Sequence, residues 1–290
     1  MFMQKHANDF SIEKMAQVLD ISRGGYYEFA SRKPSKRKAR IKYLLEAIKK
    51  VYVESRKTYG SPRVHKALKK QGIDCSRKLV AKIMRVEKIQ PKMRKNWKNH
   101  STNKSYVAVA SNLLNQQFHA EQPRMKLVSD ITYIKTRDGW LYVAGVMDLF
   151  SRKIIGLSMG GKLHTDLVIN ALNQATCELR DTTGILHHSD QGSQYTSKQF
   201  KDYVDSKGIS LSMSAKGKCY DNAAMESFFH TLKTEHVHLC DFKTKEEAKM
   251  SIFEYIEVFY NRQRIHSSLG YKTPQEMEAA WKSAHNRSVA

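Results

Sequence analysis

The fold is decided by residues 126–159, which have the sequence KLVSDITYIKTRDGWLYVAGVMDLFSRKIIGLSM. Three segments within it, residues 126–134, 140–149 and 152–159, are rich in Val, Ile, Leu and Tyr and are separated by turn residues. Short apolar runs bounded by turn signals are typical of strands. The pattern therefore predicts three antiparallel strands in a hairpin meander.

The chain beyond this meander alternates between helical and strand periodicity. Helical spacing of apolar side chains covers residues 164–180, 196–207, 222–235 and 244–263. Short apolar runs at 184–189 and 209–213 predict two more strands. We therefore expect an α/β fold with a mixed sheet, three antiparallel strands plus two, flanked by helices.

The first 124 residues are helical and strongly basic. They hold 29 Lys and Arg and 9 Asp and Glu, whereas residues 125–290 hold 21 and 19 of these side chains. The whole chain has a formal charge of +22. A positive charge concentrated in one part of a chain indicates a polyanionic partner, and nucleic acid is the common one. A basic region without a specific partner is the alternative.

A first helix-turn-helix pattern lies in residues 11–29, where Ser22 is placed to cap the second helix. The apolar stripe of the first helix consists of Ile12, Met15, Val18 and Leu19. Residues 31–40 carry six basic side chains and a proline, which predicts a linker or a phosphate-contacting arm. We assign residues 1–55 to this N-terminal segment.

A second helix-turn-helix pattern is clearer, and we assign it to a domain over residues 56–121. Ser61 and Pro62 begin one helix and Ser76 caps the next. The outer face of that next helix is basic, with Arg77, Lys78, Lys82 and Arg85. A basic helix after a tight turn suits the major groove of DNA, although a solvated surface has the same composition.

Composition argues against secretion and membrane insertion. No run of 18 or more apolar residues exists, and the first ten residues contain no apolar leader segment. The four cysteines form no CxxC pair, so a zinc ribbon and a disulfide framework are not expected. These features predict a cytoplasmic protein.

Three carboxylates carry the chemistry that we expect. Asp130 lies inside the first strand, Asp190 ends the short strand at 184–189, and Glu226 lies in the first turns of a helix. Each alone has an ordinary explanation as a hairpin acceptor, a turn cap or a solvated side chain near a helix N-terminus. Together they form an oxygen-only set that suits Mg²⁺. Two such ions can clamp the attacking and leaving oxygens of a phosphoryl transfer.

The motifs around these acids resemble those of a known family. DITYI (130–134), HSDQGSQY (188–195) and DNAAMESFFHTLKTE (221–235) are similar to bacterial insertion-sequence transposases of the two-frame (orfB) type, which have a DDE retroviral-integrase-like core. Thirty-five residues separate Asp190 from Glu226, as in that group. The resemblance extends to YGSPRVHKAL (59–68), SRKLVAKIM (76–84) and YNRQRIHSSLGYKTP (260–274). One departure is Leu127, where the family usually has Trp.

The resemblance implies a ribonuclease-H-like catalytic core over residues 122–236 and a C-terminal helical, DNA-contacting extension over 237–290. It implies that the three acids hold two Mg²⁺ ions, for which Mn²⁺ substitutes, and that Lys233 contacts the DNA end. Lys218 is a second candidate there. His188, Gln194 and Tyr195 are candidates to shape the pocket, and His188 and Tyr195 are also candidates for DNA contact. The candidates for duplex contact are Arg63, Arg77, Lys78, Lys82, Arg85, Arg262, Arg264 and His266.

The implied partners are double-stranded DNA, in the form of terminal inverted repeats and target DNA, and further copies of the chain, since pairing two ends needs at least a dimer. A protein from an upstream reading frame is a possible fusion partner. The expected location is the bacterial nucleoid within the cytoplasm. The expected reaction cuts at element ends and joins strands by direct displacement.

Other classes of protein share parts of this pattern. A sequence-specific DNA-binding repressor or a ribonuclease-H-like nuclease is the main alternative. His236 and His238 imitate the metal motif of tyrosine nickases, and Tyr260 with its basic neighbours imitates a tyrosine recombinase. Both of those classes form a phosphotyrosine adduct with DNA. Asp148 is another acid near the sheet, and we expect it to cap a turn.

Overall fold

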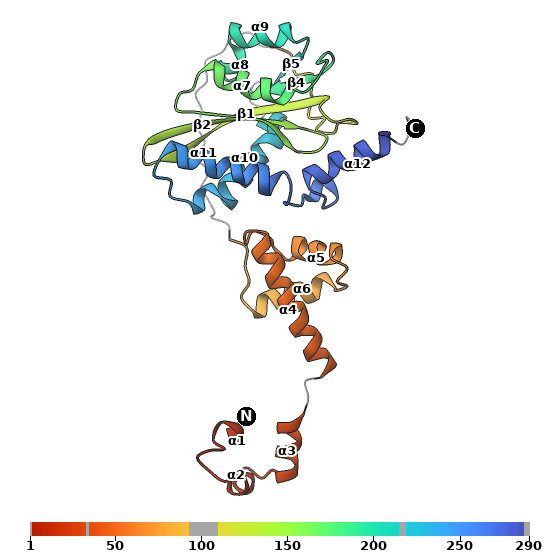
Figure 1. The fold of residues 1–290 in the computed structure, drawn as a ribbon, viewed down its shortest axis with the longest axis vertical. Helices are drawn as coiled ribbons and strands as arrows, with labels where there is room; N and C mark the ends of the chain where they lie inside the picture. Colours follow the sequence, from red (N-terminus) through yellow and green to blue (C-terminus); the bar gives the residue numbers. More distant parts are fainter. Residues whose placement is uncertain (1, 33–34, 93–109, 215–218, 287–290) are drawn as a thin grey trace.

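The computed structural model describes residues 2–32, 35–92, 110–214 and 219–286 (Figure 1). A small group of helices occupies the N-terminal end, a second group follows, and a sheet flanked by helices forms the largest part (Figure 1). Within the described ranges, no helix is long and apolar enough to cross a membrane.

The N-terminal group contains three short helices, α1 (Phe2–Lys5), α2 (Ile12–Val18) and α3 (Arg23–Ser31). The side chain of Ser22 caps α3 by accepting a hydrogen bond from Gly25 N at 3.0 Å, as predicted. The buried cluster of this N-terminal group is small and consists of Met3, Met15 and Ala16. The expected apolar stripe is only partly buried, since Val18 is 84% exposed.

The second group contains α4 (Lys36–Glu54), α5 (Ser61–Lys70) and α6 (Arg77–Val86). All three helices contribute to one hydrophobic cluster, through Leu44, Ile48, Val51, Val64, Leu68, Val80, Ile83 and Met84. The expectation of a linker over 31–40 is wrong from Lys36 onward, because Ser35 caps α4 and the basic side chains form its first turns. The boundary that we expected near residue 55 therefore falls inside this packed unit.

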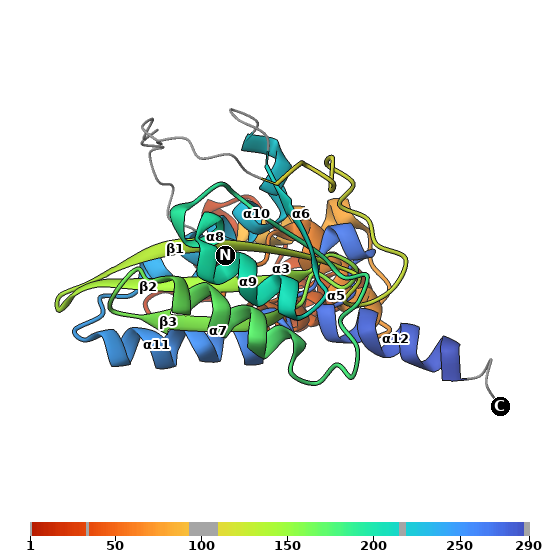
Figure 2. The ribbon, with the colours of Figure 1, turned by 90° about the horizontal axis from the view of Figure 1, so that it is seen from above.

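The sheet has five strands in the order β3-β2-β1-β4-β5. The strands are β1 (Lys126–Thr136), β2 (Gly139–Asp148), β3 (Ile154–Gly160), β4 (Leu186–Ser189) and β5 (Ser210–Met213). The first three pair antiparallel, and β4 is parallel to both β1 and β5. This arrangement confirms the predicted mixed sheet. Its antiparallel strands β1, β2 and β3 lie side by side in Figure 2.

Helices cover both faces of the sheet (Figure 1). On one side lie α7 (Thr165–Thr176), α8 (Ser193–Thr196) and α9 (Lys198–Ser206). On the other side lie α10 (Ala223–Glu235), which follows the turn η1 (Cys219–Asn222), and α11 (Lys245–Glu254). Each side has its own buried cluster, so the sheet is the central layer of the core.

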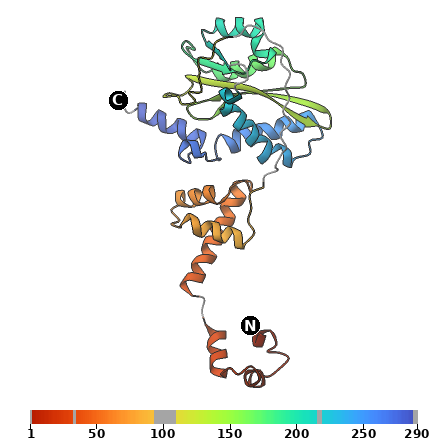
Figure 3. The ribbon, with the colours of Figure 1, turned by 180° about the vertical axis from the view of Figure 1, so that it is seen from behind.

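Apart from α11, the chain after α10 consists of short helical turns and one last helix. It contains η2 (Val237–Leu239), the π-helical turn η3 (Tyr255–Tyr260), η4 (Ser267–Leu269) and α12 (Pro274–Asn286). Thr273 and Glu276 bond reciprocally at the start of α12, at 2.9 and 3.1 Å, which is a capping box. From there α12 extends away from the core (Figure 3).

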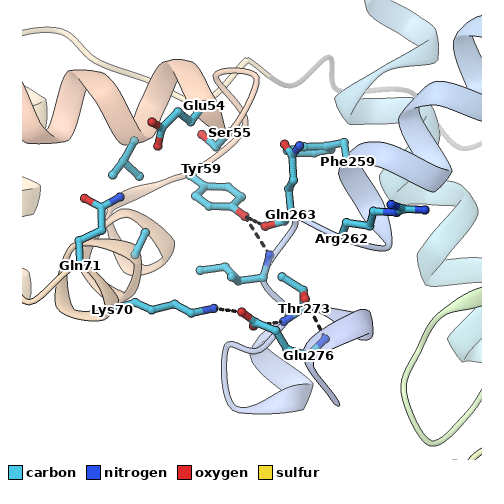
Figure 4. A pocket seen from close by; sticks show the side chains of 13 residues that line it. Glu54, Ser55, Tyr59, Lys70, Gln71, Phe259, Arg262, Gln263, Thr273 and Glu276 are labelled. Carbon is cyan, nitrogen blue, oxygen red and sulfur yellow. Dashed lines mark hydrogen bonds and ion pairs between the residues drawn. The ribbon is translucent and has the colours of Figure 1, made fainter. Parts of the chain in front are cut away.

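The second helical group docks on this C-terminal segment. The hydroxyl of Tyr59 donates to the Gln263 carbonyl at 3.3 Å and accepts from Ile265 N at 2.8 Å (Figure 4). Lys70 forms an ion pair with Glu276 across the same boundary. A cavity of about 420 Å³ lies between the two parts. The helix-turn-helix unit is thus held against the C-terminal segment of the chain.

Candidate active site

Two of the three predicted acids come together where β1 and β4 run side by side. Val128 on β1 and His188 on β4 are register partners in this parallel pair. Asp130 and Asp190 each follow two residues later, so both acids take equivalent positions on adjacent segments. Both line one open cavity of about 300 Å³.

Backbone groups orient each of these carboxylates. Asp130 Oδ1 accepts from Ile131 N at 2.8 Å, and Asp190 Oδ1 accepts from Gly192 N at 2.9 Å. A Cβ on Gly192 would lie 2.9 Å from Asp190 Oδ1, so any larger residue would displace the carboxylate. The loop HSDQGSQY therefore holds Asp190 in a fixed position before α8 begins.

Helix α10 brings the third acid to the same strand. The side-chain amide of Asn222, at the start of α10, donates to the Ser129 carbonyl at 3.0 Å instead of capping its own helix. Gly145 is the register partner of Asp130, and a Cβ there would lie 2.5 Å from Met225 Cε. The start of α10 is thus pressed against the strand position that carries Asp130.

Glu226 follows Met225 and is exposed in the first turn of α10. It is not among the described residues that line the cavity of Asp130 and Asp190. Within the described parts of the chain, no three His, Cys, Asp or Glu side chains lie close enough together to hold a metal ion. The structure thus joins two predicted acids in one cavity and places the third on the helix beside them.

Lys233 lies two turns further along α10 and is half-buried. Burial lowers the pKa of its ammonium group, and the charge of Asp130 opposes that shift. Lys233 therefore lies within electrostatic range of Asp130. The other lysine candidate, Lys218, lies outside the described residues.

His188 and Tyr195 do not lie where DNA contact was expected. His188 is fully buried, and its ring nitrogens bond to Ser212 Oγ at 2.8 Å and Ser214 Oγ at 3.2 Å. Tyr195 is 1% exposed and packs against Phe200. Burial and the nearby charges of both aspartates raise the pKa of Tyr195. Both side chains are buried in the core next to the two aspartates. Their burial does not fit a contact with DNA.

The basic face of α6 is presented as the sequence indicated. Ser76 caps the helix at 3.2 Å from Leu79 N, and Val80, Ile83 and Met84 are buried. The four basic candidates Arg77, Lys78, Lys82 and Arg85 are all exposed. Nothing in the described structure covers this face, so it is open to a polyanion.

The C-terminal candidates divide into one surface residue and two buried ones. Arg262 is exposed. Arg264 is 4% exposed, and its guanidinium donates to Glu235 at 2.8 and 2.7 Å. His266 is 9% exposed and lies 3.5 Å from Arg264 Nη1. Arg264 and His266 are therefore engaged inside the protein and do not belong to an exposed surface on which a duplex could lie.

Arg63 belongs to the same buried group. It is 3.6 Å from the carboxylate of Glu235, and its side chain is 28% exposed. Sequence reasoning missed Glu235, which is 4% exposed at the end of α10. The available signal was an acid in the last turn of a helix, where the dipole favours a cation, within a motif already rich in buried aromatic residues.

Side chains that imitate other enzyme classes have structural roles. His236 bonds to Ser251 Oγ at 2.8 Å and stacks on Tyr255, while Tyr260 is 2% exposed. Asp148 accepts from the backbone of Arg124 and Ser151 at 3.0 and 3.1 Å. The turn-capping role predicted for Asp148 is confirmed, and the burial of Tyr260 disfavours a recombinase nucleophile.

Family models match two parts of the chain. Residues 40–97 match an HTH-like domain, and residues 120–219 and 207–274 match two integrase core domain models. Among solved structures, a chain of the simian T-cell lymphotropic virus intasome in complex with PP2A regulatory subunit B56 gamma has a TM-score of 0.46 and 16% identity, covering 74% of this chain and 70% of that one. The HTLV-2 integrase catalytic core domain in complex with magnesium has a TM-score of 0.42 and 18% identity, covering 55% and 98%.

Relatives match over nearly the full length. The chain is 38% identical over 276 residues to the insertion element IS600 uncharacterized 31 kDa protein of Shigella sonnei, covering 95% of this chain and 100% of that protein. It is 37% identical over 279 residues to transposase InsF for insertion sequence IS3A of Escherichia coli, covering 96% and 97%. With its integrase core and helix-turn-helix unit, the chain therefore belongs to the family of insertion-sequence transposases that includes InsF of IS3.

Proposed function

We propose that the protein is a DNA transposase that cuts at the ends of an insertion element and joins them to target DNA by direct phosphoryl displacement. The observation that carries the proposal is the pair Asp130 and Asp190, which follow the register partners Val128 and His188 by two residues each and line one cavity. The family of the chain supports the same activity.

The donor chemistry of the cavity fits a divalent cation. Asp130 and Asp190 supply carboxylate oxygens, which Mg²⁺ prefers, while the nearby nitrogens of His188 are engaged by two serine hydroxyls. We propose that Asp130, Asp190 and Glu226 together hold two Mg²⁺ ions, with Mn²⁺ as a substitute. Bound there, the ions would neutralise charge on the reacting phosphate and lower the pKa of a water molecule.

The protein's own contribution is mainly to position groups. Backbone N–H groups fix both aspartates before the substrate arrives, so little reorganisation is needed during the reaction. Lys233, whose ammonium group interacts with the charge of Asp130, is proposed to hold a phosphate of the DNA end. Lys218 is proposed for the same role.

The reaction proceeds in two displacements at phosphorus. Water attacks the phosphodiester at the element end, the new P–O bond forms, and the strand leaves with a free 3′-hydroxyl. That hydroxyl attacks a target phosphodiester, loses its proton to solvent, and expels the 3′-oxygen of the target strand. No covalent protein intermediate forms, in contrast to a route through a tyrosine.

Duplex DNA would reach the site along the basic helical part of the chain. The exposed face of α6, with Lys82 and Arg85 at its centre, is proposed to contact the terminal inverted repeat, and Arg262 to contact DNA further along. Pairing two ends with a target requires at least a dimer on the DNA. A protein from an upstream frame is proposed as fusion or partner, and the bacterial nucleoid as the place of action.

An oligonucleotide assay tests this proposal directly. Duplexes that carry the element end should be nicked and joined to a second duplex in Mg²⁺ or Mn²⁺ and not in EDTA. A repressor would bind the same duplexes without cleaving them, and a ribonuclease-H-like nuclease would cut RNA–DNA hybrids instead. A protein–DNA adduct that survives denaturation would overturn the direct-displacement mechanism.

A further inference from the structure

A second cavity, of about 350 Å³, lies where four parts of the chain meet. Its walls include Arg63 from α5, Arg152 from the turn between β2 and β3, and Arg264 from the C-terminal segment. Residues of α10 form another wall, among them Ser227. The cavity is therefore assembled only when the helix-turn-helix unit, the sheet and the C-terminal segment are together.

Positive charge in this cavity exceeds the negative charge that compensates it. None of its described lining residues is acidic. Glu235, just behind it, pairs with both Arg264 and Arg63, at 2.7 and 3.6 Å. Arg152 donates to the Phe118 carbonyl at 2.9 Å and makes no ion pair with any described residue, while the nearby carboxylate of Asp148 partly offsets its charge. Three guanidinium groups thus have at most two carboxylates near them, and this excess of positive charge favours an anion in the cavity.

The surroundings suit a phosphate oxygen in particular. Guanidinium groups present several N–H donors in a fixed planar fork that matches phosphate geometry. The hydroxyls of Ser227, Ser267 and Ser268 line the same space and can donate further hydrogen bonds. Burial and the three arginines lower the pKa of His266 to about 2, so its imidazole is neutral and accepts from Arg264.

The cavity is separate from the candidate active site. Ala223, Ser227 and Thr231 line it and recur every four residues, so they form one face of α10. Glu226 and Lys233 are seven residues apart and lie together on a different face. An anion in this cavity would therefore occupy the other side of α10 from the proposed catalytic acid.

We propose that this cavity binds a backbone phosphate of the DNA, at a position other than the one that reacts. Because its walls come from Arg63, Arg152 and Arg264, the bound phosphate would lock the helix-turn-helix unit against the catalytic core. The proposal rests on the proposed transposase function only for the source of the phosphate. The cavity's affinity for phosphate is an independent property of the folded chain.

Thermal unfolding of the full chain tests that affinity with inorganic phosphate as the probe. Phosphate should raise the unfolding midpoint by about 2–4 °C more than sodium chloride of equal ionic strength, because a ligand that binds the native state stabilises it. Ser227→Asp places a carboxylate in the cavity from an exposed helix position. It should raise the midpoint without phosphate and remove most of the phosphate response.

Ser227→Asn is the matched neutral control, because it has the same size and no charge. It should keep the response of the unmodified protein. An equal phosphate response in Ser227→Asp and Ser227→Asn would overturn the site, since general binding to a basic protein would then explain it. Absence of any phosphate response beyond that of chloride would overturn it as well.

Binding to the element-end duplex tests the source of the phosphate. Arg152→Gln should weaken that binding about tenfold and lower the salt slope by about one. Arg137→Gln makes the same charge change at a surface arginine paired with Asp241, and should have a smaller effect. If phosphate stabilises the protein but Arg152→Gln binds DNA as Arg137→Gln does, free phosphate is the ligand and the DNA contact is wrong. Both measurements report binding and do not depend on strand transfer. A failure of the proposed transposase reaction would therefore be a separate result.

Discussion

Glu235 accepts two hydrogen bonds from the guanidinium of Arg264, from Nε at 2.8 Å and from Nη2 at 2.7 Å. The side chains are 2% and 4% exposed, and the hydroxyl of Tyr255 donates to the same carboxylate at 3.0 Å. Glu235 ends the helix that carries Glu226, and Arg264 lies in the segment on which Tyr59 docks. This buried pair therefore joins α10, which carries the proposed catalytic acid Glu226, to the segment on which the helix-turn-helix unit docks.

Glu235→Ala should strongly destabilise the protein. Removing the carboxylate leaves the charge of Arg264 buried without its partner, which costs about 3–5 kcal/mol of unfolding free energy. Urea denaturation measures the loss. Glu178→Ala breaks the surface pair with Arg124, where the acid is 75% exposed, and should cost no more than about 1 kcal/mol. Similar losses in both variants would contradict a special role for the buried pair.

Gly156→Ala should disrupt the packing of α7 on the sheet. A Cβ at Gly156 would lie 2.1 Å from the backbone oxygen of Ala171, and a backbone atom cannot move aside as a flexible side chain can. Forced overpacking of this kind typically costs about 1–3 kcal/mol of unfolding free energy, and the clash with backbone at Gly156 should put the loss near the upper end of that range. Gly24→Ala is the control, because a Cβ there meets nothing within 4 Å. The unfolding midpoint should fall for Gly156→Ala and not for Gly24→Ala. Equal midpoints would show that α7 can shift to accommodate the added methyl group.

Lys82→Ala combined with Arg85→Ala should weaken binding to duplex DNA. Both side chains lie on the exposed face of α6, so losing two phosphate contacts should lower the slope of log K against log salt by about two. Titrations over a range of salt concentrations measure that slope. Lys207→Ala combined with Lys282→Ala removes the same charge from exposed positions elsewhere. A slope that changes equally in both double variants would remove α6 from the interface.

Stability should fall in mild acid because of a buried histidine. His187 is fully buried and lies 2.7 Å from Ser129 Oγ, and burial lowers its pKa from 6.5 to about 3. Between these values the unfolded chain binds a proton that the native protein does not. The stabilisation is thus complete above about pH 6.5 and is lost by about 1.4 kcal/mol per pH unit below it.

His187→Gln removes this titration and keeps a hydrogen-bonding group beside Ser129. Urea unfolding at several values between pH 6 and 4 should show a slope of stability against pH that is smaller by about one proton. The slope is informative even if the variant is less stable throughout. An unchanged slope would mean that His187 does not resist protonation in the native state.

Much of the sheet was predictable because its signals are local. The strands are short apolar runs between turn residues, and the observed β1, β2 and β3 lie within a few residues of the predicted segments. Ser22 and Ser76 cap the helices that the sequence assigned to them. Asp130 and Asp190 meet because β1 and β4 pair in parallel, which the strand pattern alone does not specify.

The differences concern side chains whose partners are distant in sequence. Arg264 was predicted as a surface residue because its carboxylate partner, Glu235, lies in another segment 29 residues away. His188 is buried, and its ring nitrogens form hydrogen bonds with Ser212 in β5 and Ser214 just after it. No local sequence pattern indicates these two contacts. The basic stretch beginning at Lys36 resembled a linker because its side chains are charged. It is the start of a helix capped by Ser35, and the buried face of that helix begins only at Leu44.

The central claim is that Glu226 acts with Asp130 and Asp190 in strand transfer. The most direct measurement is joining of an element-end oligonucleotide to a target duplex in Mg²⁺ by Glu226→Gln, which keeps the side-chain size and removes the charge. We expect the variant to unfold at the same midpoint and bind the duplex with the same affinity, while joining falls by about a hundredfold to a thousandfold, as for loss of an electrostatic group that stabilises the transition state. Glu246→Gln, an exposed acid in α11, should join normally. Near-normal joining by Glu226→Gln would contradict the assignment.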